Sequence, residues 1–103
     1  GSAAAASLYQ AALAYEQTIA LSQAPNERAL AHLWLAWVDA KLQRCNDAAN
    51  QLQLGQAAFR QRAELDSTSP AYTEFSDSFR MLRDLVVLPD VAKACPDITI
   101  QKD

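Results

Sequence analysis

ALAHLWLAWV, residues 29–38, is the stretch that determines the fold, because His32 is its only polar residue. A helix that is apolar almost all the way round is normally buried on several sides. We therefore expect the helix that contains this stretch, at about residues 26–45, to be the central helix of an all-α domain.

Two segments with helical periodicity flank this central helix. The first spans about residues 4–23 and ends before Pro25, and the third spans about residues 47–65. No glycine or proline lies between the second and third segments at residues 43–46. These two segments therefore form either a helical hairpin or one kinked helix, and we expect the hairpin.

A fourth helix is expected at about residues 70–88. Ser69–Pro70 is a typical start, because serine suits the N-cap and proline the first helical position. We expect Pro89 to end this helix, since proline lacks the N–H that a continuing helix needs. A short turn at residues 90–95 and a tail at residues 96–103 should follow.

Short connections make consecutive helices antiparallel, which predicts a four-helix up-down-up-down bundle in a single domain, residues 1–103. This topology brings Cys45 and Cys95 to the same end of the bundle. We predict a Cys45–Cys95 disulfide that ties the C-terminal turn to the bundle. The alternative is a pair of free buried thiols in a cytosolic protein. A disulfide would indicate an extracytoplasmic location, most simply the periplasm or attachment to the outer membrane.

Composition limits the class of partner. The chain has 103 residues, a net charge of −3 and nine scattered Lys and Arg residues, which disfavours nucleic acid and anionic lipid. No apolar run is long enough for a transmembrane span. Gly1-Ser2 resembles an expression scar, so a lipid anchor upstream is compatible with the sequence. Residues 3–6, all alanine, are either a frayed first turn or the end of a tether.

Residues able to carry catalysis do not form a constellation. His32 is the only histidine, and Asp39 lies about 10 Å further along the same helix, too far for a hydrogen bond. We expect His32 on the surface, no catalytic residue, no metal and no cofactor, and hence no enzyme. Gly55 stands alone in a helix and is expected to admit a bulky neighbour, Trp37 or Phe79.

Several apolar residues recur off the expected core faces. They are Leu54, Ala58 and Leu65 on the third helix, with Met81 and Leu88 on the fourth. A contiguous apolar stripe on a monomer indicates a partner, and we predict these five as partner-binding residues. A slightly different rotation of the helices would bury them instead.

These features favour a non-enzymatic protein-interaction domain of the bacterial cell envelope. Such a domain would bind another protein through an amphipathic segment, as an accessory, pilotin-like or immunity-type binding protein, either secreted or a lipoprotein. The alternative is a carrier or sensor domain that binds a small apolar ligand between helices. Its ligand would lie around Trp34 and Trp37, which we expect to face the first helix.

Overall fold

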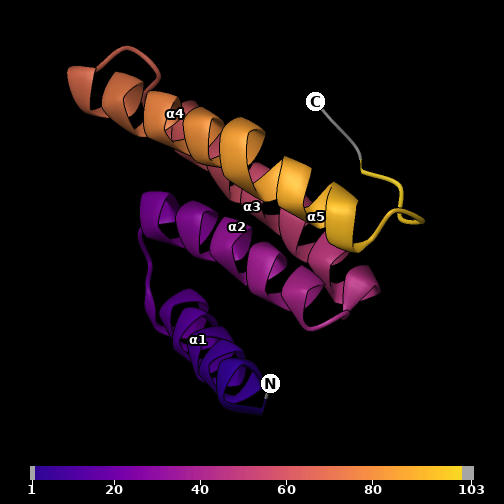
Figure 1. Ribbon diagram of the computed structural model, residues 1–103. Helices are drawn as coiled ribbons and strands as arrows, with labels where there is room; N and C mark the ends of the chain where they lie inside the picture. Colours follow the sequence, from indigo (N-terminus) through magenta and orange to yellow (C-terminus); the bar gives the residue numbers. More distant parts are fainter. Residues whose placement is uncertain (1, 101–103) are drawn as a thin grey trace.

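The computed structural model describes residues 2–100, and all regular secondary structure in this range is helical. The predicted all-α fold of packed helical hairpins is confirmed (Figure 1). The elements are α1 (Ser2–Leu21), α2 (Pro25–Lys41), α3 (Cys45–Leu65), α4 (Pro70–Leu82), a π-helical turn (Arg83–Val87) and α5 (Leu88–Ala94). None of the helices in this range combines the length and hydrophobicity that a membrane-spanning helix needs.

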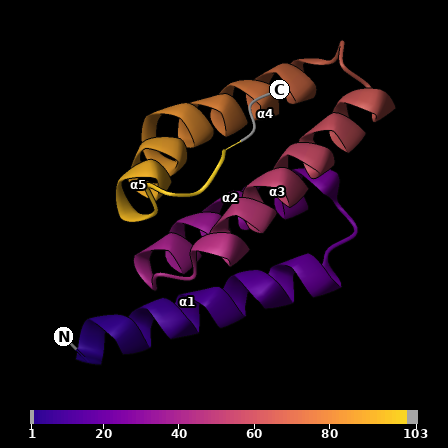
Figure 2. The same ribbon diagram turned by 90° about the vertical axis from the view of Figure 1, so that its right-hand side faces the viewer.

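The central helix α2 is buried on two sides, which accounts for its apolar sequence. One side contributes to a first core cluster with α3, α4, the π-helical turn and α5. The other side contributes Leu35 and Val38 to a second core cluster, which they form with Ala12 of α1. Within the described residues, α1 packs against α2 and against no other helix. Figure 2 shows α1 lying along α2, away from α4 and α5.

Small residues allow α2 and α3 to pack closely. The buried positions in this contact follow a helical spacing on both helices: Ala29, Leu33, Ala36 and Ala40 on α2, and Ala48, Leu52, Gly55 and Phe59 on α3. A Cβ atom at Gly55 would lie 3.2 Å from Cβ of His32 and 3.4 Å from the carbonyl oxygen of Ala29. Gly55 therefore admits α2 itself, and the expectation that it admits Trp37 or Phe79 is wrong.

Large aromatic residues separate α3 from α4. The ring of Phe59 stacks on Phe79 at a centroid distance of 4.6 Å, and Tyr72 and Phe75 pack beside them. The guanidinium of Arg80 lies 5.4 Å from the centre of the Phe59 ring, a favourable cation–π arrangement. This layer holds the hairpin that α3 and α4 form.

The start of α4 agrees with the sequence-based prediction. Ser69 is the N-cap, and its Oγ accepts a hydrogen bond of 3.1 Å from the backbone N–H of Tyr72. Pro70 occupies the first helical position, where its missing N–H would have had no partner.

The predicted end at Pro89 is wrong, because the helix continues to Ala94. A proline within an α-helix removes one hydrogen bond and clashes with the carbonyl four residues earlier. Here the π-helical turn ends at Val87, two residues before Pro89, and the N–H of Leu88 bonds to the carbonyl of Arg83, five residues back. The wider turn lets the chain accept the proline, so residues 90–94 are helical instead of forming a turn.

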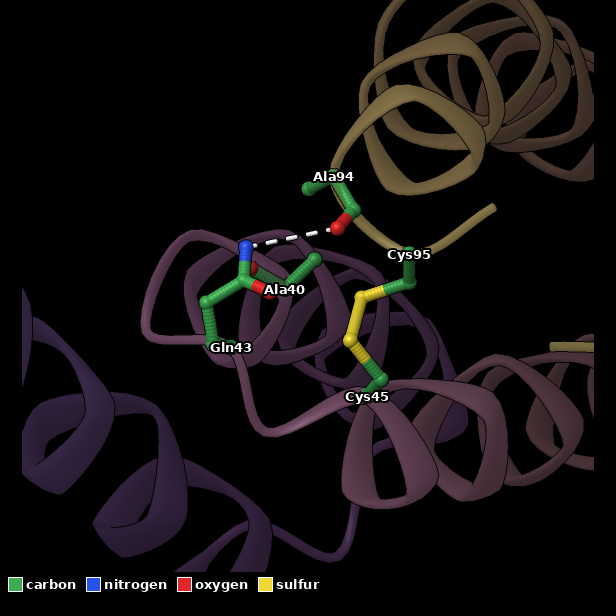
Figure 3. The surroundings of a disulfide bond; sticks show 5 residues. All are labelled: Ala40, Gln43, Cys45, Ala94 and Cys95. Atoms are coloured by element: carbon green, nitrogen blue, oxygen red, sulfur yellow. Dashed lines mark hydrogen bonds between the residues drawn. A yellow bond between two sulfur atoms is a disulfide. The ribbon is translucent and has the colours of Figure 1, made fainter. Parts of the chain in front are cut away.

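The two cysteines meet as predicted. Cys45 and Cys95 form a disulfide with a Cα–Cα distance of 5.6 Å (Figure 3). Beside it, Gln43 has a positive φ of 61°, which breaks the chain between α2 and α3 into a hairpin. Its side-chain amide donates a hydrogen bond of 3.3 Å to the carbonyl of Ala94. Two separate contacts therefore fix the end of α5 to this hairpin.

The segment after the disulfide is not a free tail over its whole length. Ile98 and Ile100 are half-buried and pack against the first core cluster. Residues 101–103 lie outside the described residues.

The disulfide gives the first testable prediction. It closes a loop of 50 residues, so replacing both cysteines with alanine should lower the free energy of unfolding by about 2–4 kcal/mol. Urea denaturation followed by circular dichroism measures this change. Intact mass under denaturing conditions should rise by about 2 Da on reduction, since each sulfur gains a hydrogen. An unchanged mass would exclude the bond.

Candidate functional site

The five residues predicted as a partner-binding stripe do not share one exposed face. Leu54, Leu65 and Met81 are exposed, with accessible fractions of 41%, 68% and 60%. Ala58 is buried in the first core cluster, and its expected position off the core is wrong. Leu88 is half-buried against the same cluster. Only three members of the predicted stripe are therefore available to a partner in this conformation.

The rotation of α3 explains the burial of Ala58. Gly55 must face α2, because the close packing of the two helices depends on its missing side chain. Ala58 follows one turn later on the adjacent side of α3, which the same packing covers. The sequence alone left this rotation open, since a small residue fits either environment.

Two of the exposed members, Leu54 and Met81, do not adjoin one another. Gln56 lies about 200° around α3 from Leu54. Gln56 is the residue whose side-chain oxygen accepts a hydrogen bond of 3.0 Å from Arg83, two positions after Met81. Leu54 and Met81 are each about half a turn away from the two residues of this hydrogen bond. They therefore lie on different sides of the α3–α4 hairpin. Partner binding by the exposed members stays a prediction.

The outward side of α2 forms a different surface, between α1 and α5. Leu30, Trp34, Trp37 and Lys41 recur at helical spacing along it. Lys41 is exposed and the other three are half-buried, although most of α2 is fully buried. We call these four residues the open face of α2. Their spacing of four, three and four residues is visible in the sequence, although the sequence-based expectation concerns only Trp34 and Trp37 and places both against the first helix.

The two tryptophans of the open face have different surroundings. The indole N–H of Trp37 donates a hydrogen bond of 2.7 Å to the carboxylate of Asp90 on α5, and Trp37 contacts both core clusters. Its hydrogen bond corrects the expectation that Trp37 faces only helix one. Trp34 packs edge-on against Trp37 at a centroid distance of 5.9 Å. Trp34 belongs to neither cluster.

Trp37 should therefore stabilise the fold more than Trp34. We expect Trp37→Ala to lower the free energy of unfolding by about 2–4 kcal/mol, because it removes packing and leaves Asp90 without its donor. Trp37→Phe, which keeps a ring, should cost about half as much. Trp34→Ala should stay within about 1 kcal/mol of wild type. Urea denaturation of the three variants tests this order, and equal effects at both tryptophans would contradict it.

His32 is buried, so its predicted surface position is wrong. It is 4% exposed, and its Nδ1 atom donates to the side-chain oxygen of Gln51 on α3 at 2.7 Å. Burial lowers the pKa of His32, and the nearby Arg28 acts in the same direction, whereas the bond to Gln51 opposes both. A neutral histidine with a hydrogen-bond partner is a structural member of the α2–α3 contact.

Asp39 is the most unusual ionisable residue of the described chain. It is 3% exposed, and its carboxylate lies 3.7 Å from the guanidinium of Arg44. Burial raises the pKa of Asp39 to about 6; Arg44 lowers it, and the carboxylates of Asp47 and Glu16 raise it further. The sequence indicates Asp39 only as a possible partner of His32 and not as a buried carboxylate, although an acidic residue next to a buried apolar run is a recognisable signal.

Three surface hollows of the described residues lie away from the two tryptophans. Three shallow hollows have volumes of about 340, 570 and 280 Å³. They lie beside α5, beside the connection between α1 and α2, and at the disulfide, respectively. Neither Trp34 nor Trp37 lines any of the three. Within residues 2–100, no group of three or more His, Cys, Asp or Glu side chains is placed to hold a metal ion.

Comparisons with protein-family models, curated proteins and solved structures find no match to this chain.

The two buried ionisable groups predict a pH dependence of stability. The raised pKa of Asp39 means that its ionisation disfavours the folded state. Its stabilising contribution is present below about pH 4 and is lost as the pH rises through about 6. His32 acts in the opposite direction, because its lowered pKa makes the folded state favour the neutral ring. Its contribution is present above pH 6.5 and is lost in acid.

A variant separates the two contributions. Relative to wild type, Asp39→Asn should become more stable by up to about 3 kcal/mol between pH 4 and pH 7.5, because asparagine stays neutral. Urea denaturation at several pH values measures this difference, and His32, which is present in both proteins, cancels. A difference that stays constant with pH would show that Asp39 titrates normally.

Proposed function

We propose that the chain is a non-enzymatic protein-interaction domain of the bacterial cell envelope, of the accessory, pilotin-like or immunity-type kind. The observation that carries this proposal is the open face of α2, where two half-buried tryptophans lie between α1 and α5. Tryptophan is strongly enriched among residues that dominate binding energy at protein interfaces. An amphipathic helix of a partner, laid along this face, would cover Trp34 and Leu30.

The envelope location rests on the disulfide. A bond between Cys45 and Cys95 is typical of an oxidising compartment and rare in the cytosol. A lipid anchor on a longer native chain is compatible with this location and belongs to the same proposal.

A binding experiment tests the proposed surface. A photo-reactive amino acid at position 34 should cross-link to one partner protein in envelope preparations, and mass spectrometry of the linked peptide should identify a helical segment. Trp34→Ala should weaken binding of that peptide at least tenfold, as loss of a central aromatic residue commonly does. Leu13→Ala is the matched control, since Leu13 is 60% exposed on α1 and should leave the affinity unchanged.

Two outcomes would contradict the proposed surface. If Leu54→Asp abolishes binding and Trp34→Ala does not, the partner binds on α3, as the stripe prediction has it. If position 34 cross-links to no protein, while an added apolar dye quenches tryptophan fluorescence, the carrier hypothesis is favoured instead.

A further inference from the structure

Helix α1 is attached to the rest of the molecule from one side only. Within the described residues it packs against α2 alone. Its apolar contact centres on Ala12. At its C-terminal end, the guanidinium of Arg28 donates a hydrogen bond of 2.7 Å to the carbonyl of Ile19. At its N-terminal half, the guanidinium of Arg44 lies 5.0 Å from the centre of the Tyr9 ring.

Asp39 lies beside this attachment. It follows Leu35 by one helical turn and Val38 directly, and these are the α2 residues of the second core cluster. The charged groups that act on it come from three parts of the chain: Glu16 from α1, Asp47 from α3, and Arg44 from the connection between α2 and α3. Three carboxylates therefore surround one cation at the edge of the α1–α2 contact.

We propose that the docking of α1 onto α2 is controlled by protonation of Asp39. The helix is held firmly when this carboxyl is neutral and loosens when it ionises, so that rising pH uncovers Leu35 and Val38. This inference goes beyond the proposed function and does not depend on it.

Reciprocity of coupled equilibria sets the direction of the effect. Docked α1 helps to exclude water from Asp39 and brings Glu16 close to it, and both favour the neutral carboxyl. Because docking of α1 favours the neutral carboxyl of Asp39, ionisation of that carboxyl must disfavour docking by the same free energy. Arg44 opposes this by pairing with the ionised form. Arg44 also lies against the Tyr9 ring of α1, so its pairing with Asp39 works against the effect of burial. The near-complete burial of Asp39, which is 3% exposed, sets the direction.

A second ionisable group acts at the other end of the helix. His32 is close enough to Arg28 to interact with it electrostatically, and Arg28 is the residue that binds the carbonyl of Ile19. Protonation of His32 would repel Arg28 and would loosen α1 in acid, opposite to the effect of Asp39. The experiment therefore has to separate the two residues.

Native-state hydrogen exchange measures the opening of α1 directly. Opening constants, corrected for the pH dependence of intrinsic exchange, are compared at pH 5 and pH 7.5. For the amides of Ala12 and Tyr15 we expect the opening constant to rise at least threefold between these two pH values. The upper limit is about tenfold for each unit by which docked α1 raises the pKa of Asp39. The amides of Leu52 and Phe59 in α3 should not change.

Variants assign the effect to Asp39. Asp39→Asn should abolish the rise, Glu16→Gln should reduce it, and His32→Gln should preserve or increase it. Asp77→Asn, at an exposed position of α4, is the matched control and should behave like wild type. A carbon-13 titration of the Asp39 carboxyl should give a lower pKa in Glu16→Gln than in wild type.

Three results would overturn the proposal. The first is no change in the opening of α1 in the wild-type protein. The second is a rise that persists in Asp39→Asn. The third is an equal rise in α3, which would mean that the whole domain opens instead of α1.

Discussion

The close packing of α2 on α3 is the constraint on which the remaining structure depends. Gly55 and the alanines of this contact bring the backbones of the two helices close together, so that a Cβ atom at position 55 would lie 3.2 Å from Cβ of His32. Large core residues such as Phe59 and Phe79 fill the space toward α4. Because the opposite side of α2 packs on α1, nearly all of residues 29–38 have to be apolar. The open face of α2, which includes Trp34 and Lys41, is only partly covered.

The α4–α5 side of the molecule is held by a different kind of interaction. Aromatic rings on α3 and α4 keep these helices apart, and the short helix α5 contributes one fully buried residue, Val91, to the first core cluster. The Cys45–Cys95 disulfide attaches the end of α5 covalently, and the hydrogen bond from Gln43 adds a polar contact. The π-helical turn serves the same purpose, because it lets α4 continue into α5 as one rod despite Pro89. A seven-residue helix on its own would not be stable.

The sequence predicted those features that depend on local chemistry or on topology alone. The meeting of Cys45 and Cys95 followed from short connections and antiparallel helices, and the structure confirms it. The extension beyond Pro89 was missed because a π-helical turn leaves no clear mark in the residue pattern. Ala58 and His32 were misplaced because the rotation of a helix is fixed by its partner, here by the close contact at Gly55. The open face of α2 was missed for the same reason, since helical spacing does not reveal which neighbour a stripe meets.

The least supported helix of the domain is also the one beside its buried carboxylate. Free energies of local opening are lowest where a segment has few buried contacts, and α1 contacts one helix only. Asp39 adds a cost there that depends on its charge, whereas the α2–α3 contact carries no such cost at neutral pH because His32 is uncharged. The open face around Trp34 is bounded on one side by α1. A displacement of α1 would therefore change the width of the surface on which we propose that a partner binds, so the protonation of Asp39 and the binding of a partner would be coupled through this helix.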